Sequence, residues 1–135
     1  MRLFLFINFA FCIALAAQGQ DSLIRKSIYF GGGSYYIDEY QGDEIIDFLN
    51  SIDDLTKYEI VLFSHTDNIG GKQYNEWLSH MRSEAVKYEL IQFGIREEEI
   101  DIRAFGQDNP LYSNKSSDGR VMNRRVDIIL VPITS

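Results

Sequence analysis

The amino-acid sequence predicts a two-layer α/β sandwich with the element order β-α-β-α-β-β. Hydrophobic residues make up 45% of the 135-residue chain and charged residues 24%, proportions that are typical of a folded domain and exclude wholesale disorder. Short runs rich in β-branched and aromatic residues alternate with segments whose apolar residues recur every three or four positions. The length allows one domain and little more.

The N-terminal segment, residues 1–19, has the pattern of a secretory signal peptide. Arg2 supplies a positive start, an almost wholly apolar run follows to residue 17, and small and polar residues come next. A transmembrane anchor is the alternative, but roughly 15 apolar residues fall short of the ~20 that span a bilayer. Lipid attachment at Cys12 is disfavoured because bulky Phe11 precedes this cysteine. We expect cleavage near residues 17–19, which leaves a domain over residues 20–135 with no cysteine and no transmembrane segment.

The elements of this domain follow from local patterns. The expected order is a strand at 27–30, a helix at 38–52, a strand at 58–63, a helix at 74–93, and strands at 100–104 and 125–131. Residues 58–63 (YEIVLF) have the composition of a buried strand. Gly31-Gly32-Gly33 ends the first strand, and Gly94 closes the longest helical pattern where helices often end.

The charge and the arrangement of polar residues exclude several classes of function. The net charge of −7 lacks the basic footprint of a nucleic-acid binder and gives no attraction to anionic lipid. His65, Asp67 and His80 could be taken for metal ligands, but His80 falls on the opposite side of its helix from Arg82. The glycines at 31–33 are not followed by the Lys-Ser/Thr of a phosphate-binding loop. We therefore expect no metal and no other cofactor.

One face of the predicted helix 74–93 changes from polar to apolar along its length. Asn75, Ser79 and Arg82 begin this face, and it is apolar from Val86 onward. Polar residues at the start of a core-facing stripe, next to a glycine-bearing loop, favour a binding site on a rigid element. The alternative is that the helix is rotated and buries the competing apolar face formed by Tyr74, Trp77, Met81, Ala85 and Tyr88.

Motifs in several parts of the chain extend this interpretation. They are residues 64–70 (SHTDNIG), 74–86 (YNEWLSHMRSEAV), 105–110 (FGQDNP) and 119–126 (GRVMNRRV). In order and spacing they resemble the signature motifs of the OmpA-like peptidoglycan-binding domain family, and the resemblance extends over residues 28–130. Ser64 and Ser83 depart from the pattern, because they stand where the family has glycine and alanine. Both are small, so we expect the packing to be preserved.

The resemblance implies a ligand, the diaminopimelate residue of the cell-wall stem peptide, bound without covalent chemistry. It assigns six residues to this site: Asp67 and Arg82 as ligand-binding residues, Asn75 as a lining residue, Arg124 as a bordering residue, and Gly32 and Gly33 as backbone contacts.

The chemistry of the ligand suits these residue types. The free end of diaminopimelate carries an ammonium and a carboxylate on one carbon. Asp67 can accept hydrogen bonds from the ammonium, and Arg82 can bind the carboxylate through two parallel bonds. A structural salt bridge between Asp67 and Arg82 is the alternative. We expect the pair at the rim of the core, so that loss of either side chain leaves the fold intact.

The resemblance therefore predicts a noncatalytic domain that binds peptidoglycan in the periplasm and associates with the cell wall and outer membrane. Outer-membrane or other envelope proteins are further expected partners. The alternative function is an envelope protein–protein interaction module that keeps the fold without binding the wall. Hydrolysis of the wall is a third possibility, which release of soluble fragments would reveal.

Overall fold

The computed structural model describes residues 22–133, so the predicted signal peptide with Cys12 lies outside the described residues. Four strands form one sheet in the order β1-β4-β2-β3: β1 (Ile24–Tyr29), β2 (Tyr58–His65), β3 (Ile100–Gly106) and β4 (Arg125–Pro132). The β4 strand runs antiparallel to β1 and β2, whereas β2 and β3 are parallel. The predicted α/β fold class is therefore confirmed, with a mixed sheet.

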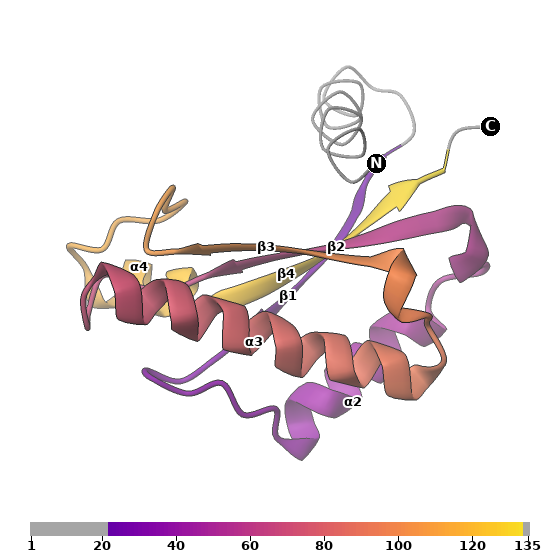
Figure 1. Cartoon of the computed structure of the whole chain (residues 1–135), viewed down its shortest axis with the longest axis horizontal. Helices are drawn as coiled ribbons and strands as arrows, with labels where there is room; N and C mark the ends of the chain where they lie inside the picture. Colours follow the sequence, from indigo (N-terminus) through magenta and orange to yellow (C-terminus); the bar gives the residue numbers. More distant parts are fainter. Residues whose placement is uncertain (1–21, 134–135) are drawn as a thin grey trace.

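The two long helices, α2 (Glu39–Asn50) and α3 (Lys72–Phe93), lie on the same face of this sheet (Figure 1). They enclose the main core with the strands, and its fully buried members include Ile28, Ile45, Leu62, Val86, Leu90, Ile128 and Leu130. On α3 the buried stripe contains Asn75, Ser79 and Arg82, while Tyr74, Trp77 and Tyr88 are exposed. The alternative in which α3 is rotated is therefore wrong.

Local chemistry explains where the helices begin and end. Asp38 caps α2: its side chain accepts from the Gln41 N–H, and the Gln41 side chain accepts from the Asp38 N–H. Gly94 ends α3 in the left-handed conformation, as expected. Two short 3-10 turns, η1 (Leu55–Lys57) and η2 (Glu97–Glu99), precede β2 and β3. Within residues 22–133, no helix is both long enough and apolar enough to cross a membrane.

The structure adds one helix that the sequence patterns do not predict. It is α4 (Ser117–Asn123), in the segment expected to be a loop, so the order is β-α-β-α-β-α-β. The Ser116 side chain caps it by accepting from the Gly119 N–H. Seven residues that include glycine, serine and aspartate carry too little periodicity to indicate a helix.

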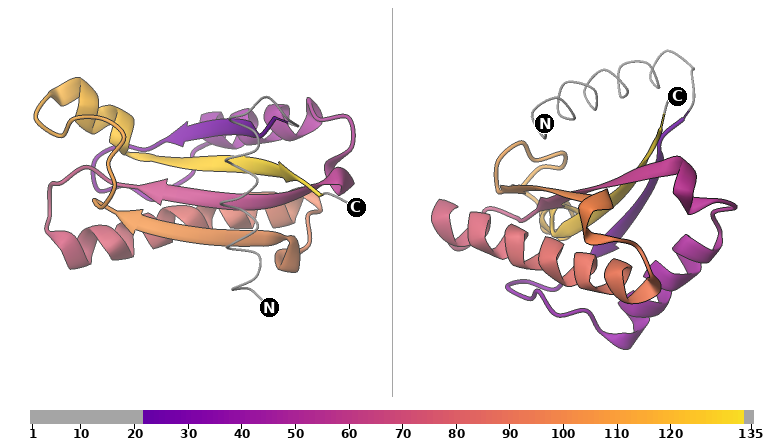
Figure 2. Two further views of the ribbon diagram at one scale, coloured as in Figure 1. Left: turned by 90° about the horizontal axis from the view of Figure 1, so that it is seen from above. Right: turned by 45° about the vertical axis from the view of Figure 1, so that its right-hand side comes forward.

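The connections that follow β1, β2 and β3 meet at one end of the sheet (Figure 2). Strand pairing defines this end: Arg125 at the start of β4 lies between Tyr29 and His65, and His65 pairs with Gly106. The glycine loop before α2, the loop before α3 and the segment that contains α4 therefore converge. Four of the six predicted site residues lie in these segments, and the other two, Asn75 and Arg82, extend toward the same end from α3.

Candidate functional site

Arg82 is the largest of the fully buried side chains, with 0% of its surface exposed. Its guanidinium donates hydrogen bonds to three backbone carbonyls. Nε reaches the carbonyl of Ser34 at 2.7 Å and Nη2 that of Gly31 at 3.0 Å. Nη1 reaches the carbonyl of His65 at 3.2 Å. The guanidinium carbon also lies 5.2 Å from the centre of the Phe30 ring. Arg82 therefore ties the glycine loop to the end of β2.

This burial corrects the expectation that Arg82 lies at the rim of the core. Desolvation lowers the pKa of Arg82 to about 10; the charge of Asp67 opposes this shift and that of Arg124 adds to it. The side chain therefore stays protonated at neutral pH. The site has a permanent cation beneath its surface, held by carbonyl groups.

Asp67 forms its ion pair with Arg124 rather than with Arg82. The distance from Arg124 Nη1 to Asp67 Oδ2 is 3.4 Å, and Asp67 Oδ1 accepts from the Ile69 N–H at 3.1 Å. The Arg124 side chain is 21% exposed and that of Asp67 8% exposed. Arg124 Nε is buried and has no hydrogen-bond partner among residues 22–133. With Arg82 below, two cations and one carboxylate leave a local positive charge on an acidic chain.

Asn75 is fully buried beside the loop that follows β3. Its Nδ2 donates to Gln107 Oε1 at 2.9 Å, while its Oδ1 has no hydrogen-bond partner within the described part of the chain. The Ser79 hydroxyl, one turn later, accepts from the Gly106 N–H at 2.9 Å. Gln107 is therefore a site residue that sequence reasoning did not assign, although it lies within the FGQDNP motif.

The glycine loop lies directly over the charged residues. A Cβ atom on Gly32 would lie 3.8 Å from Arg124 Nη1, and one on Gly33 would lie 3.6 Å from the Tyr74 hydroxyl. Gly33 has a φ of +70°, a conformation that favours glycine. The structure thus brings Gly32, Arg124 and Asp67 together above Arg82, with Asn75 in the adjoining contact to Gln107.

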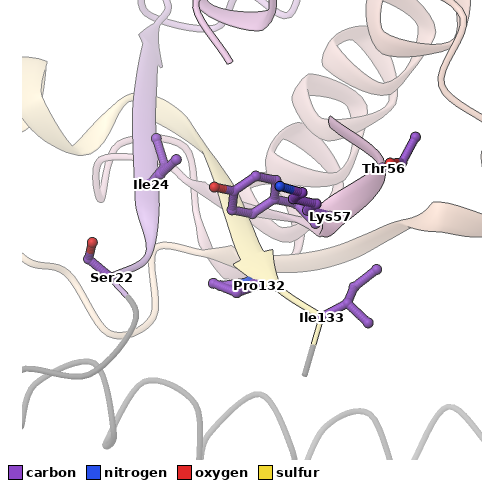
Figure 3. A pocket seen from close by; sticks show the side chains of 7 residues that line it. Ser22, Ile24, Thr56, Lys57, Pro132 and Ile133 are labelled. Atoms are coloured by element: carbon purple, nitrogen blue, oxygen red, sulfur yellow. The ribbon is translucent and has the colours of Figure 1, made fainter. Parts of the chain in front are cut away.

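Two other features of the described chain were weighed as candidate sites, a metal centre and a surface hollow. No group of three His, Cys, Asp or Glu side chains within residues 22–133 is placed to hold a metal ion. His80 is half-exposed and lies 3.5 Å from Glu84. A hollow of about 530 Å³ occurs at the opposite end of the sheet (Figure 3), and the residues that line it are Ser22, Ile24, Thr56, Lys57, Tyr58, Pro132 and Ile133. It contains none of the predicted site residues.

Among curated proteins, the chain is similar to parts of longer outer-membrane proteins. The chain is 42% identical over 72 residues to outer membrane protein A of Bordetella avium, a match that covers 53% of this chain and 37% of that protein. It is 39% identical over 72 residues to the outer-membrane lipoprotein YfiB of Pseudomonas aeruginosa, covering 53% and 43%. These matches span less than half the length of either relative.

Solved structures share the fold. The peptidoglycan-associated lipoprotein from Burkholderia pseudomallei superposes with a TM-score of 0.71 at 23% identity, covering 78% of this chain and 89% of that chain. The C-terminal domain of Helicobacter pylori MotB gives a TM-score of 0.70 at 21% identity, covering 81% and 86%. The model of the OmpA family matches residues 29–124, which include the whole candidate site. The chain therefore belongs to the OmpA family.

Proposed function

We propose that this chain binds peptidoglycan noncovalently through the diaminopimelate residue of the stem peptide. The observation that carries this proposal is the Asp67–Arg124 ion pair, in which Arg124 is partly exposed, with the Arg82 cation buried beneath it. Membership of the OmpA family supports wall binding in general and a noncatalytic role. The choice of diaminopimelate rests on the residues that match the family's ligand-binding motif.

The two ends of the ligand's amino-acid group find complementary partners at this ion pair. The ammonium approaches Asp67, whose carboxylate can accept more hydrogen bonds than the two it already receives. The carboxylate approaches Arg124, whose guanidinium has N–H groups left for a charge-assisted bond. The net positive charge of the cluster favours the carboxylate, and Gly32 lets the backbone come close.

Arg82 acts from below the ligand. It uses one N–H of each guanidinium nitrogen to hold the carbonyls of Gly31, Ser34 and His65. Because its side chain is fully buried, direct contact with a ligand requires the glycine loop to shift. In the conformation described, Arg82 orders that loop and adds positive charge to the site. The expected contact between Arg82 and the carboxylate therefore depends on displacement of that loop.

The start of α3 adds to this electrostatic environment. The helix begins at Lys72, five residues after Asp67, and no side chain caps its N-terminus. Its first-turn N–H groups carry partial positive charge along the axis of a 22-residue helix. This charge stabilises an anionic group bound beside the loop. The proposal places the domain at residues 20–135, exported by the signal peptide at 1–19 to the periplasm, with envelope proteins as further partners.

Cosedimentation with purified sacculi tests the proposal. The wild type should pellet with diaminopimelate-type sacculi and much less with lysine-type sacculi, because lysine lacks the distal carboxylate. Asp67→Asn removes the charge but keeps an oxygen for the Ile69 N–H, so the fold is retained. Binding should weaken by roughly 2 kcal/mol or more, the cost of leaving a partner charge unpaired.

Asp108→Asn is the matched control, because Asp108 is exposed, lies near the same helix terminus and pairs loosely with Lys72 at 3.8 Å. It should bind as the wild type does. Arg82→Ala is a poor probe of ligand binding, because it leaves three buried carbonyls without their hydrogen-bond donor and creates a cavity. Equal pelleting of Asp67→Asn and wild type would show that the site is wrong. A folded wild type that binds neither kind of sacculi would support the alternative function, an envelope protein–protein interaction module.

A further inference from the structure

Three large aromatic side chains form a continuous exposed surface at the start of α3. Tyr35 comes from the loop before α2, and Tyr74 and Trp77 come from the first turns of α3. The Trp77 ring centre lies 5.6 Å from that of Tyr35 and 5.7 Å from that of Tyr74. These side chains are 41%, 44% and 46% exposed, in the order Tyr35, Tyr74 and Trp77. We refer to them as the aromatic platform.

The fold does not need this surface for its core. The buried stripe of α3 runs through Asn75 and Arg82, so Tyr74 and Trp77 are turned toward solvent. Because Trp77 contacts both tyrosines, the rings support one another in fixed positions. The Tyr74 and Trp77 rings are inclined by 35°, whereas Tyr35 meets Trp77 edge-on at 81°, so a flat partner would lie on Tyr74 and Trp77 beside Tyr35. A preordered surface of this kind binds such a partner with little loss of side-chain entropy. Adjacent large aromatic residues left on a surface are typical of a binding region.

The aromatic platform is continuous with the candidate site. Tyr74 precedes Asn75, and its hydroxyl is the nearest neighbour of a Cβ built on Gly33. Tyr35 follows Ser34, whose carbonyl accepts a hydrogen bond from Arg82. The loop before α2 passes beside the start of α3 in both Figure 1 and Figure 2. The part of a ligand that extends beyond the ion pair therefore lies close to these rings.

We propose that the aromatic platform binds the pyranose ring of a peptidoglycan amino sugar, as a second subsite next to the peptide site. This inference rests on the proposed function, because the stem peptide is covalently joined to the glycan and brings a sugar within reach. One face of a pyranose ring presents C–H groups, which suit the electron-rich face of an aromatic ring. The sugar's hydroxyl and amide edges stay hydrated. Tethering to the peptide raises the local sugar concentration, so a weak contact adds measurable affinity.

Charge argues against a lipid surface as the occupant. The chain has a net charge of −7, and the exposed Glu76 lies next to Trp77 in the sequence. Anionic headgroups are therefore repelled. A neutral sugar carries no such penalty.

Tryptophan fluorescence gives a direct readout, because Trp77 is the only tryptophan of the chain. Two ligands are compared: the sugar-free stem tripeptide containing diaminopimelate, and the same peptide attached to its disaccharide. The disaccharide peptide should change the Trp77 emission and bind roughly five- to tenfold more tightly, the gain expected of one aromatic stacking contact. The sugar-free peptide should bind with little change in emission.

Calorimetry with variants assigns the gain to the aromatic platform. Trp77→Ala should bind both ligands with the affinity that the wild type shows for the sugar-free peptide, and Trp77→Phe should keep part of the gain. Tyr88→Ala is the matched control, since Tyr88 is an exposed aromatic residue on the same helix outside the platform, and it should behave as the wild type. Circular dichroism confirms that each variant is folded.

Failure of this inference and failure of the proposed function give different results. Equal affinity of the wild type for the two ligands would overturn the sugar subsite while leaving the peptide site intact. Equal weakening of both ligands by Trp77→Ala would also overturn it, because Trp77 would then act on the peptide. No binding of the sugar-free peptide would overturn the proposed function and this inference together. Trp77-dependent binding to phosphatidylglycerol vesicles, with unchanged binding of the disaccharide peptide, would identify a membrane contact instead.

Discussion

At the scale of single residues, two serines mark where the chain departs from the family motifs. Ser64 and Ser83 are fully buried, and their hydroxyls have no hydrogen-bond partner within residues 22–133. An unpaired buried hydroxyl costs about 1–3 kcal/mol. Both side chains fit into the core, as their small size led us to expect, but their hydroxyl groups add no stabilising contact.

Removal of the Ser83 hydroxyl should therefore stabilise the protein. Ser83→Ala deletes an unpaired group and places the best helix former in α3, so the free energy of unfolding should rise by about 1 kcal/mol. Ser79→Ala, one turn earlier, is the matched comparison. The Ser79 hydroxyl donates to the Glu76 carbonyl and accepts from the Gly106 N–H, so its loss should destabilise by about 1 kcal/mol. Urea denaturation measures both changes, and a loss of stability in Ser83→Ala would mean that its hydroxyl is paired.

At the scale of secondary-structure elements, Gly106 sets how closely the end of β3 approaches the start of α3. Its φ is +60°, and a Cβ there would lie 2.9 Å from the Glu76 amide nitrogen and 3.0 Å from the Asn75 carbonyl carbon. Those are backbone atoms, which cannot relieve a clash by changing rotamer as a side chain can. The close approach holds Gln107 within reach of Asn75.

Gly106→Ala should therefore be far more costly than the same change at Gly71. Both glycines have positive φ, but a Cβ on Gly71 would meet nothing within 4 Å. Backbone strain alone should cost Gly71→Ala about 1–3 kcal/mol, because its φ of 85° and ψ of 159° form a combination that essentially only glycine adopts. Gly106→Ala adds a clash with the helix backbone and should cost roughly 3 kcal/mol or more. Thermal unfolding compares the variants, and similar losses of stability would show that β3 and α3 can move apart at no cost.

At the scale of the whole molecule, stability should depend on the protonation of His65. This side chain is buried on the face of the sheet opposite α2 and α3, stacked on Phe105 with ring centres 5.3 Å apart. The pKa of His65 is lowered to about 4, chiefly by burial and then by the charge of Arg125; Asp127 opposes this shift and Arg25 contributes to it. Nδ1 has no hydrogen-bond partner among the described residues, so a proton there would be poorly accommodated.

The sign of the pH effect follows from the lowered pKa. In the unfolded chain His65 binds a proton near pH 6.5, whereas the folded protein resists protonation until about pH 4. The free energy of unfolding should therefore fall as the pH drops from 6.5 to 4, by roughly 3 kcal/mol. Urea denaturation across this range should show a shallower fall in His65→Gln. His80→Gln removes an exposed imidazole as the control, and an unchanged pH profile in His65→Gln would contradict the assignment.

Whole-molecule architecture was largely predictable from local patterns. The dense apolar run at 58–63 indicated β2, and the long periodic segment closed by Gly94 indicated α3, because burial on one or both faces imposes those patterns. Element ends differ by a few residues, since β1 starts at Ile24 and α3 at Lys72. The short helix α4 escaped prediction because its stability comes from the cap at Ser116 and from packing.

The sequence by itself determined the family, the order of the strands and long helices, and the residue types of the candidate site. Motifs preserve chemistry and spacing, so Asp67, Arg82 and Arg124 could be assigned to one region. Tertiary structure alone decided their partnerships: Asp67 pairs with Arg124, while Arg82 is buried on backbone carbonyls. Every residue has a backbone carbonyl, so the sequence does not indicate which carbonyls accept hydrogen bonds from Arg82. Which carbonyls surround a buried cation depends on how distant segments meet in three dimensions.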